Sequence, residues 1–231
     1  MSLKLKSNPK RLIKWVVLGL TLLLLLIFFV RVLTWEDDYY RRMEGAERAV
    51  VAKEDTPREE LVEVAPTESE VHEHIVEPDE PRYLSIEKLG IVNSRIVQVG
   101  INSSGELGTP NNIFDVGWYE ASGKPGAGKT MLIDGHNGGP HVHGVFKDLP
   151  ELQTGDIIVV ERGDGKIFRY SVVENVEVSL DESDMYMATA MKSPQTGKES
   201  LTLISCTGEW SDARYTYLSR QFTRAVLTEN S

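Results

Sequence analysis

One apolar, β-prone stretch leads into the only cysteine of the chain: Leu201-Thr202-Leu203-Ile204-Ser205-Cys206-Thr207-Gly208-Glu209-Trp210. Gly208 breaks this run just after the thiol. The pattern predicts a buried strand that delivers Cys206 to its end, where a loop begins. A single cysteine has no partner for an intramolecular disulfide. Cys206 is therefore either an inert, buried small hydrophobe or a nucleophile.

Short apolar runs separated by glycine- and proline-rich turns continue on both sides of this stretch, from residue 83 to the end of the chain. A short helix is predicted over Ser183–Met191. Seven or eight short strands with few helical patterns predict an all-β domain with short helices, closed or nearly closed into a barrel. The predicted strands are Leu84–Ile86, Ile96–Val99, Thr130–Ile133, Ile157–Glu161, Ile167–Val173, Leu201–Ser205 and Gln221–Leu227.

The N-terminal part of the chain has a different character. Basic residues precede an uncharged run from Trp15 to Val30, and no small-x-small cleavage site follows it. We expect a cytoplasmic tail over residues 1–11 and an uncleaved transmembrane signal anchor over residues 12–34, with the remainder outside the cell. Residues 35–82 are acidic and rich in proline, which predicts a flexible, disordered linker before a domain at 83–231.

Two functions are disfavoured by the residues. The formal net charge of −10 offers no basic face to a nucleic acid. The segment Gly123–Thr130 satisfies the phosphate-binding pattern G-x-x-x-x-G-K-[ST] letter for letter, but that motif requires a buried strand before the loop and a helix after it. Because the strand Thr130–Ile133 is predicted to follow, we expect a glycine-rich surface turn that binds no nucleotide.

Three histidines, His136, His141 and His143, lie close together in the sequence. One interpretation is a zinc-dependent hydrolase that uses all three, although no carboxylate or cysteine completes a familiar metal spacing. His141 and His143 lie in a loop rich in glycine and proline. His136 differs, because it follows the predicted strand Thr130–Ile133 at a point where a side chain is held rigidly.

A thiol enzyme needs a thiolate, a proton shuttle and a donor for the oxyanion. Cys206 and His136 would supply the first two. Arginine is a permanent cation suited to the third task, and both Arg214 and Arg220 follow Cys206 closely. A further alternative is a non-catalytic, membrane-tethered binding barrel, which would tolerate Cys206→Ala.

With these motifs in place, the chain resembles the sortase family over Tyr83 to Leu227. Thr202-Leu203-Ile204-Ser205-Cys206 matches the signature T-L-x-T-C, with Ser205 in place of the second threonine. Leu132-Ile133-Asp134-Gly135-His136 is similar to the segment that carries the family histidine. Further matches are Gly144–Asp156, Ile86–Ile91 and Gly117–Tyr119. The segments Gly117–Tyr119 and Cys206–Gly208 look closest to the class E and F branches.

The resemblance implies an eight-stranded sortase-type barrel and an extracellular cysteine transpeptidase, tethered to the membrane, that needs no cofactor. Cys206 would attack the Thr–Gly bond of a Leu-Pro-x-Thr-Gly-like sorting signal in a secreted protein, forming a thioester, and His136 would be the acid and base. The acceptor would be an amine of a cell-wall precursor or a pilin lysine. Such an enzyme belongs on the surface of a Gram-positive-type bacterium.

The resemblance also bears on the choice of arginine. The family arginine is followed by apolar residues, with a small residue five positions on. Arg220 fits this frame with Ala225, while Arg214 fits a shorter spacing and is the runner-up. Ser205, next to the nucleophile, is expected to support substrate binding or the oxyanion.

Overall fold

The computed structural model describes residues 61–102, 105–139 and 141–230. The chain divides into two units, Met1–Arg58 and Glu59–Ser231, and the first lies outside the described residues. The predicted cytoplasmic tail, transmembrane anchor and first part of the linker therefore stay predictions. Within the described residues, no helix combines the length and the apolar character needed to cross a membrane.

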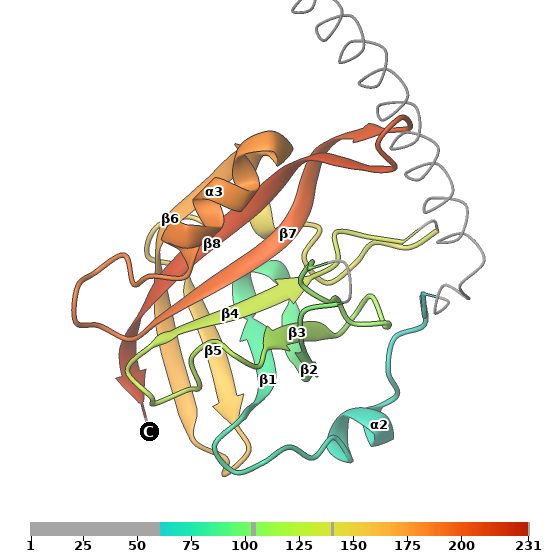
Figure 1. Ribbon diagram of the computed structural model, residues 1–231. Helices are drawn as coiled ribbons and strands as arrows, with labels where there is room; N and C mark the ends of the chain where they lie inside the picture. The colour runs from blue at the N-terminus through green and yellow to red at the C-terminus, as the bar shows by residue number, and fades with distance from the viewer. Residues whose placement is uncertain (1–60, 103–104, 140, 231) are drawn as a thin grey trace, which may run out of the picture. The chain divides into compact units, whose positions relative to one another are not determined.

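The described strands form one closed β-barrel (Figure 1). They follow one another around it in the order β1-β2-β3-β4-β7-β8-β6-β5, and β1 pairs with β5 to close the ring. This confirms the predicted eight-stranded barrel with short helices. The strands are β1 (Pro81–Ile86), β2 (Ile91–Val99), β3 (Val116–Tyr119), β4 (Thr130–Gly135), β5 (Ile157–Arg162), β6 (Ile167–Ser179), β7 (Ser200–Ser211) and β8 (Thr216–Asn230). The helices are α2 (Glu68–His72), η1 (Glu87–Leu89), η2 (Leu149–Glu151) and α3 (Leu180–Ala190).

The described part of the predicted linker lies against the barrel. Val62 forms a parallel bridge with Asn112, and the hydroxyl of Tyr83 donates to the carbonyl of Val71 at the end of α2. β1 already begins at Pro81, before the predicted domain boundary at residue 83. Residues 61–80 thus include a short helix and backbone contacts that an acidic, proline-rich composition does not indicate.

β7 does not end after the cysteine, so the prediction that Gly208 terminates the strand is wrong. The strand continues to Ser211, and the pairing with β8 shifts its register between Thr207 and Trp210. Gly208 adopts a φ of +81°, which glycine tolerates far better than other residues. A Cβ there would also lie 2.9 Å from the Ser219 hydroxyl oxygen. The glycine therefore allows a β-bulge, and Cys206 lies within a paired strand.

The side chains of β4, β7 and β8 alternate between two apolar layers, as the period of a strand requires. Met131, Ile133, Leu201, Leu203 and Ala225 belong to the cluster that fills the barrel. The neighbouring residues Leu132, Ile204 and Phe222 belong to a second cluster that includes Tyr186 and Met187 of α3. Because Cys206 lies two residues after Ile204, its side chain is on the outer face of the barrel with this second cluster.

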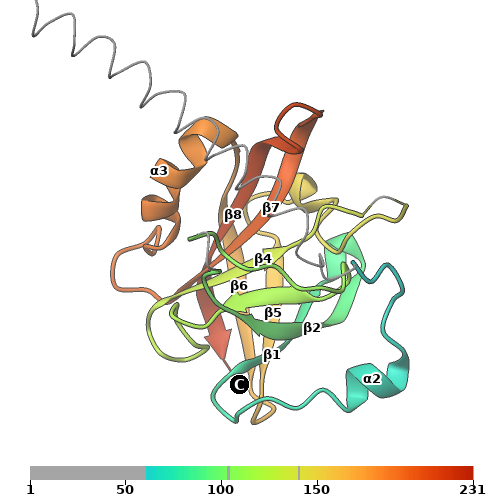
Figure 2. The same cartoon turned by 45° about the vertical axis from the view of Figure 1, so that its right-hand side comes forward.

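Helix α3 covers part of that outer face, over β6 and β8 (Figures 1 and 2). Arg224 of β8 fixes the end of the helix. Its guanidinium pairs with Glu174 and donates to the carbonyls of Thr189 and Lys192, at 3.2 and 2.9 Å. A cation at the carbonyl end of a helix also complements the helix dipole. Arg224 is thus a buried anchor for α3.

The glycine-rich turn before β4 already holds an anion from the protein itself. The backbone N–H groups of Gly126 and Gly128 donate to the two carboxylate oxygens of Glu199, at 2.9 and 2.7 Å. The hydroxyl of the buried Tyr170 donates to the same carboxylate at 2.7 Å. The amides that would face a phosphate in a nucleotide-binding loop are therefore occupied, and strand β4 follows the turn.

We predict that the full-length protein binds no ATP, because Glu199 satisfies these amides. Titration with ATP and magnesium, followed by calorimetry, should give no saturable heat for the wild type or for Lys129→Ala. Saturable micromolar binding that Lys129→Ala abolishes would show that the turn is a nucleotide site after all.

Candidate active site

The parallel pairing of β4 with β7 brings His136 and Cys206 together. The pairs run from Thr130 opposite Ser200 to Asp134 opposite Ile204. The hydroxyl of Ser205 then donates to the carbonyl of Gly135 at 2.9 Å, across the same separation of 70 residues. His136 directly follows β4, so this register carries it to Cys206.

A second hydrogen bond holds the strands just beyond that point. The side-chain amide of Asn137 donates to the carbonyl of Cys206 at 2.8 Å. Together with the bond from Ser205, it fixes the backbone on both sides of the His136–Cys206 pair. The thiol itself is free and partly buried.

Arg220 lies directly opposite Cys206 on the neighbouring strand β8. Opposite residues of paired strands share a face of the sheet. Val178 of β6 lies opposite Arg220 in turn. Three strands therefore present Cys206, Arg220 and Val178 as one row on the outer face of the barrel, and His136, the first residue after β4, extends this row next to Cys206.

The guanidinium of Arg220 is oriented by its own strand. It donates to the carbonyls of Tyr217 and Ser219, both at 3.0 Å, and to the hydroxyl of Thr216 at 3.2 Å. These contacts hold a half-buried cation beside the thiol. A cation fixed in advance is the arrangement that stabilises a developing oxyanion.

Arg214 is placed elsewhere. It lies in the exposed turn between β7 and β8 and forms an ion pair with Asp181 at the start of α3, at 2.7 Å. Both side chains of this pair are at least half exposed, so solvent screens the attraction. The structure thus brings Arg220, and not Arg214, to the cysteine.

Ser205 faces away from the thiol and is buried, because neighbouring residues of a strand point to opposite sides. Its hydroxyl is bound to the carbonyl of Gly135. This hydrogen bond from Ser205 therefore helps to fix the register of β7 against β4. Its predicted part in substrate binding or oxyanion support stays a prediction.

The three histidines do not converge. His136 is half-buried, and its Nε2 lies 2.7 Å from the carbonyl oxygen of Pro110. Because a carbonyl only accepts, Nε2 carries a proton, and Nδ1 is the nitrogen left to exchange one. His141 and His143 are exposed on the loop after β4. Across residues 61–102, 105–139 and 141–230, no three His, Cys, Asp or Glu side chains are grouped so as to hold a metal ion.

Burial and charge act in opposite directions on the thiol. Burial raises the pKa of Cys206 above its ordinary value, and the positive charge of Arg220 lowers it. The carboxyl of Asp134 adds a smaller effect that raises the pKa of the thiol. Since burial dominates, the free enzyme holds Cys206 mainly as the neutral thiol at neutral pH.

Sequence reasoning selected Cys206 and His136 as the candidate nucleophile and acid/base, and it assigned no role to two neighbours of this pair. Asp134 precedes His136 by two residues and so shares its face of β4, a spacing that is visible in the sequence. Asn137 donates to the Cys206 carbonyl, but nothing in the sequence except its position next to His136 indicates this contact.

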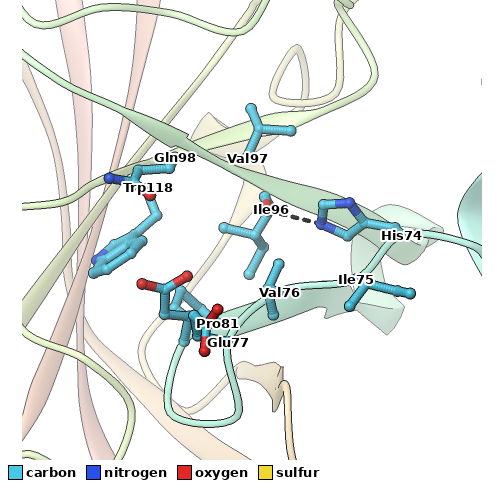
Figure 3. Close-up of a pocket in the computed structure, with 10 residues that line it drawn as sticks. His74, Ile75, Val76, Glu77, Pro81, Ile96, Val97, Gln98 and Trp118 are labelled. Atoms are coloured by element: carbon cyan, nitrogen blue, oxygen red, sulfur yellow. Dashed lines mark hydrogen bonds between the residues drawn. The ribbon is translucent and has the colours of Figure 1, made fainter.

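A separate pocket of about 460 Å³ lies where residues 74–81 cross β2 and β3 (Figure 3). His74 closes one side, with its Nε2 2.9 Å from the carbonyl oxygen of Ile96. Trp118, Gln98 and Glu77 line other parts of it. No predicted site residue lines this pocket, so it is distinct from the row that contains Cys206.

Comparison with protein families gives one match, to the sortase domain, over residues 84–228. The matched segment is more than half of the chain and contains the whole row of candidate residues. The chain therefore belongs to the sortase family, and the protein is a cysteine transpeptidase. The family match leaves the class E and F assignment a prediction.

Several solved sortase structures are similar to this chain. The SrtA sortase from Actinomyces oris is 20% identical over 68% of this chain and 84% of its own, with a TM-score of 0.48. Sortase E1 from Streptomyces coelicolor, solved with a tripeptide in the active site, is 23% identical over 66% and 91%, with a TM-score of 0.48. The Clostridium perfringens Sortase D5 transpeptidase is 23% identical over 71% and 90%, with a TM-score of 0.46. Comparison with curated proteins gives no match.

The buried carboxyl of Asp134 predicts a pH-dependent stability. Burial raises its pKa from 3.8 to about 7. Below the ordinary value, both the folded and unfolded states are protonated. As the pH rises toward 7, the unfolded state ionises first, so the wild type loses stability relative to Asp134→Asn. The Asn variant should therefore have the higher Tm, and its advantage should grow between pH 4 and pH 8. The corresponding difference in unfolding free energy should reach roughly 2–4 kcal/mol.

Thermal unfolding by circular dichroism measures this difference. Asp156→Asn is the control, because the hydrogen bond from Lys88 lowers the pKa of Asp156. Removing the Asp156 charge should lower the Tm at neutral pH and have less effect in acid. This pH dependence is opposite to the one expected for Asp134→Asn. A Tm difference for Asp134→Asn that is constant with pH would contradict the assignment.

Proposed function

We infer that this sortase is an extracellular, membrane-anchored enzyme that cleaves a Leu-Pro-x-Thr-Gly-like sorting signal between Thr and Gly and transfers the protein to an amine. The observation that carries the proposal is that Arg220 lies opposite Cys206 on β8, while the β4–β7 register places His136, the first residue after β4, next to Cys206. This arrangement supplies a nucleophile, a proton shuttle and a cation on one face.

In the first step, Cys206 gives its proton to Nδ1 of His136, which becomes the imidazolium, and the sulfur attacks the Thr carbonyl carbon. The carbonyl π electrons move to oxygen, and Arg220 stabilises the resulting oxyanion. The tetrahedral intermediate collapses to a thioester as the C–N bond to Gly breaks. His136, as the imidazolium, protonates the leaving Gly amine at Nδ1, so the products are an acyl-enzyme and a released peptide.

In the second step, the acceptor amine attacks the thioester carbon. His136 removes the proton from the amine, and the same guanidinium stabilises the second tetrahedral intermediate. Collapse restores the Cys206 thiolate and leaves a new amide bond. The acceptor is an amine of a cell-wall precursor or a pilin lysine, with water as the default acceptor.

A shallow pocket of about 370 Å³ between β6 and α3 supports this substrate class. Val178, which lies opposite Arg220, lines it together with Met185 and Tyr186 of α3. The pocket thus opens next to the catalytic row. Glu177, Glu182 and Thr189 complete its lining, so its apolar part, and not the whole pocket, suits the Leu and Pro of a sorting signal whose Thr carbonyl lies at Cys206.

The location of the enzyme rests on the sequence. The basic residues before the apolar run at 12–34 keep the N-terminus in the cytoplasm and leave the catalytic barrel outside. That position gives the enzyme access to secreted proteins and to cell-wall acceptors in a Gram-positive-type bacterium.

The first test compares four alanine variants of the full-length protein: Cys206→Ala, His136→Ala, His141→Ala and His143→Ala. Acyl-enzyme formation with a sorting-signal peptide is followed by mass spectrometry. Cys206→Ala should form no thioester, and His136→Ala should be slower by about 10²–10⁴. The two loop histidines should be dispensable, because both side chains are exposed outside the row. Equal loss in His136→Ala and His141→Ala would favour a different arrangement, such as a zinc site.

The second test separates the two arginines. Arg220→Ala should lower kcat/KM by an amount equivalent to about 2.7–4 kcal/mol, the usual cost of losing one oxyanion donor. Arg220→Lys should stay impaired, because lysine lacks the planar fork. Arg214→Ala should be near normal, since its ion pair with Asp181 is exposed. A crippled Arg214→Ala beside a near-normal Arg220→Ala would reverse the assignment.

A further inference from the structure

The carboxyl group of Asp134 is enclosed on the same face as the catalytic row. Its residue is 8% exposed, and its Oδ2 is buried without a hydrogen-bond partner. Asp134 lies two residues before His136 and opposite Ile204, which lies two residues before Cys206. A buried carboxylate oxygen that makes no hydrogen bond is costly in its charged form. Because burying this carboxyl costs folding stability, we looked to the function of the site for the role of Asp134.

The ionisable groups around Asp134 indicate what its carboxyl group can act on. Its own strand contributes His136, β7 contributes Cys206, and β8 contributes Arg220. From β3 the paired residue is Gly117, which carries no charge. The remaining ionisable groups of the outer apolar cluster are the phenols of Tyr119 on β3 and Tyr186 on α3, and Tyr186 donates to Glu174. Arg220 is the cation whose charge acts on both Asp134 and Cys206.

We propose that Asp134 is a positioning residue that controls how much of the positive charge of Arg220 is available to the Cys206 sulfur. The proposal rests on the proposed role of Cys206 as the nucleophile. When Asp134 is protonated, the guanidinium acts on the thiol alone. When Asp134 is ionised, its negative charge offsets the guanidinium and disfavours the thiolate. The two acids of the site thus compete for one cation.

A thiol normally becomes more reactive as the pH rises, because more of it is ionised. Ionisation of Asp134 over the same pH range opposes this increase. The raised pKa of Asp134, about 7, places its ionisation near neutral pH. Below that pH, the full charge of Arg220 favours the thiolate. Above that pH, the negative charge of the Asp134 carboxylate opposes ionisation of the Cys206 thiol. Removing the carboxylate charge should therefore ease thiol ionisation in neutral and basic solution.

The test measures the alkylation of Cys206 by iodoacetamide as a function of pH. Cys206 is the only cysteine of the chain, so the full-length protein reports this one thiol without any substrate. Asp134→Asn should move the midpoint of the rate profile to lower pH by about one unit, which is an approximately tenfold faster alkylation at pH 8. Glu199→Gln is the matched control, since this buried carboxyl is bound to the glycine-rich turn and to Tyr170. Its midpoint should equal that of the wild type.

The same pair of proteins is then compared in the Arg220→Gln background. Without the guanidinium, Asp134 is harder to ionise and has no cation to offset, so Asp134→Asn should change the rate less than it does when Arg220 is present. An unchanged midpoint in the first comparison, or an equal shift in both backgrounds, would overturn the proposal. If Asp134→Asn does not fold, Asp134→Ser gives the same comparison. Loss of transpeptidation on peptides with an intact alkylation shift would count against the proposed substrate and not against this coupling.

Discussion

The parallel pairing of β4 with β7 is the constraint on which the site depends. All six residues of β4 are buried, so its register against β7 cannot slip without moving apolar side chains to the wrong face. Parallel neighbours also require a long crossover. Here the crossover contains β5, β6 and α3, which complete the barrel and cover part of its outer face. The pairing that joins β4 to β7 within the barrel is thus also the one that brings His136 close to Cys206.

The electrostatics of the site follow from this location. Cys206 lies partly buried on the outer face, and this burial opposes formation of the thiolate. Arg220 counteracts the effect at a fixed position, held by three hydrogen bonds to Tyr217, Ser219 and Thr216. In the proposed mechanism, the same cation would also stabilise the oxyanion.

Much of this architecture could be predicted from the sequence, because it depends on local patterns. Apolar runs that end in Cys206 and His136 indicate buried strands, and the spacing of the other runs indicates a barrel. Gly208 shows the limit of such reasoning, since the same residue suits a strand end and a β-bulge, and only the partner strand decides. β3, four residues long and containing a glycine, has no periodicity to detect.

The remaining features depend on residues that are distant in the sequence. Glu199 fills the glycine-rich turn from 71 residues away, measured to Gly128, so the motif alone could not reveal its occupant. The choice of Arg220 over Arg214 followed a family frame, and the structure supplies the physical reason in the Cys206–Arg220 register. The surroundings of Asp134 involve side chains from three strands, which no local pattern contains.

A crystal structure of the protein covalently trapped by a thiol-reactive analogue of a Leu-Pro-x-Thr-Gly peptide tests the central claim most directly. The account predicts a bond from the Cys206 sulfur to the Thr carbon, with the Thr oxygen within hydrogen-bond distance of the Arg220 guanidinium and Nδ1 of His136 directed at the leaving-group side. A trapped complex in which Arg220 stays bound to Thr216 while another group holds the Thr oxygen would contradict it.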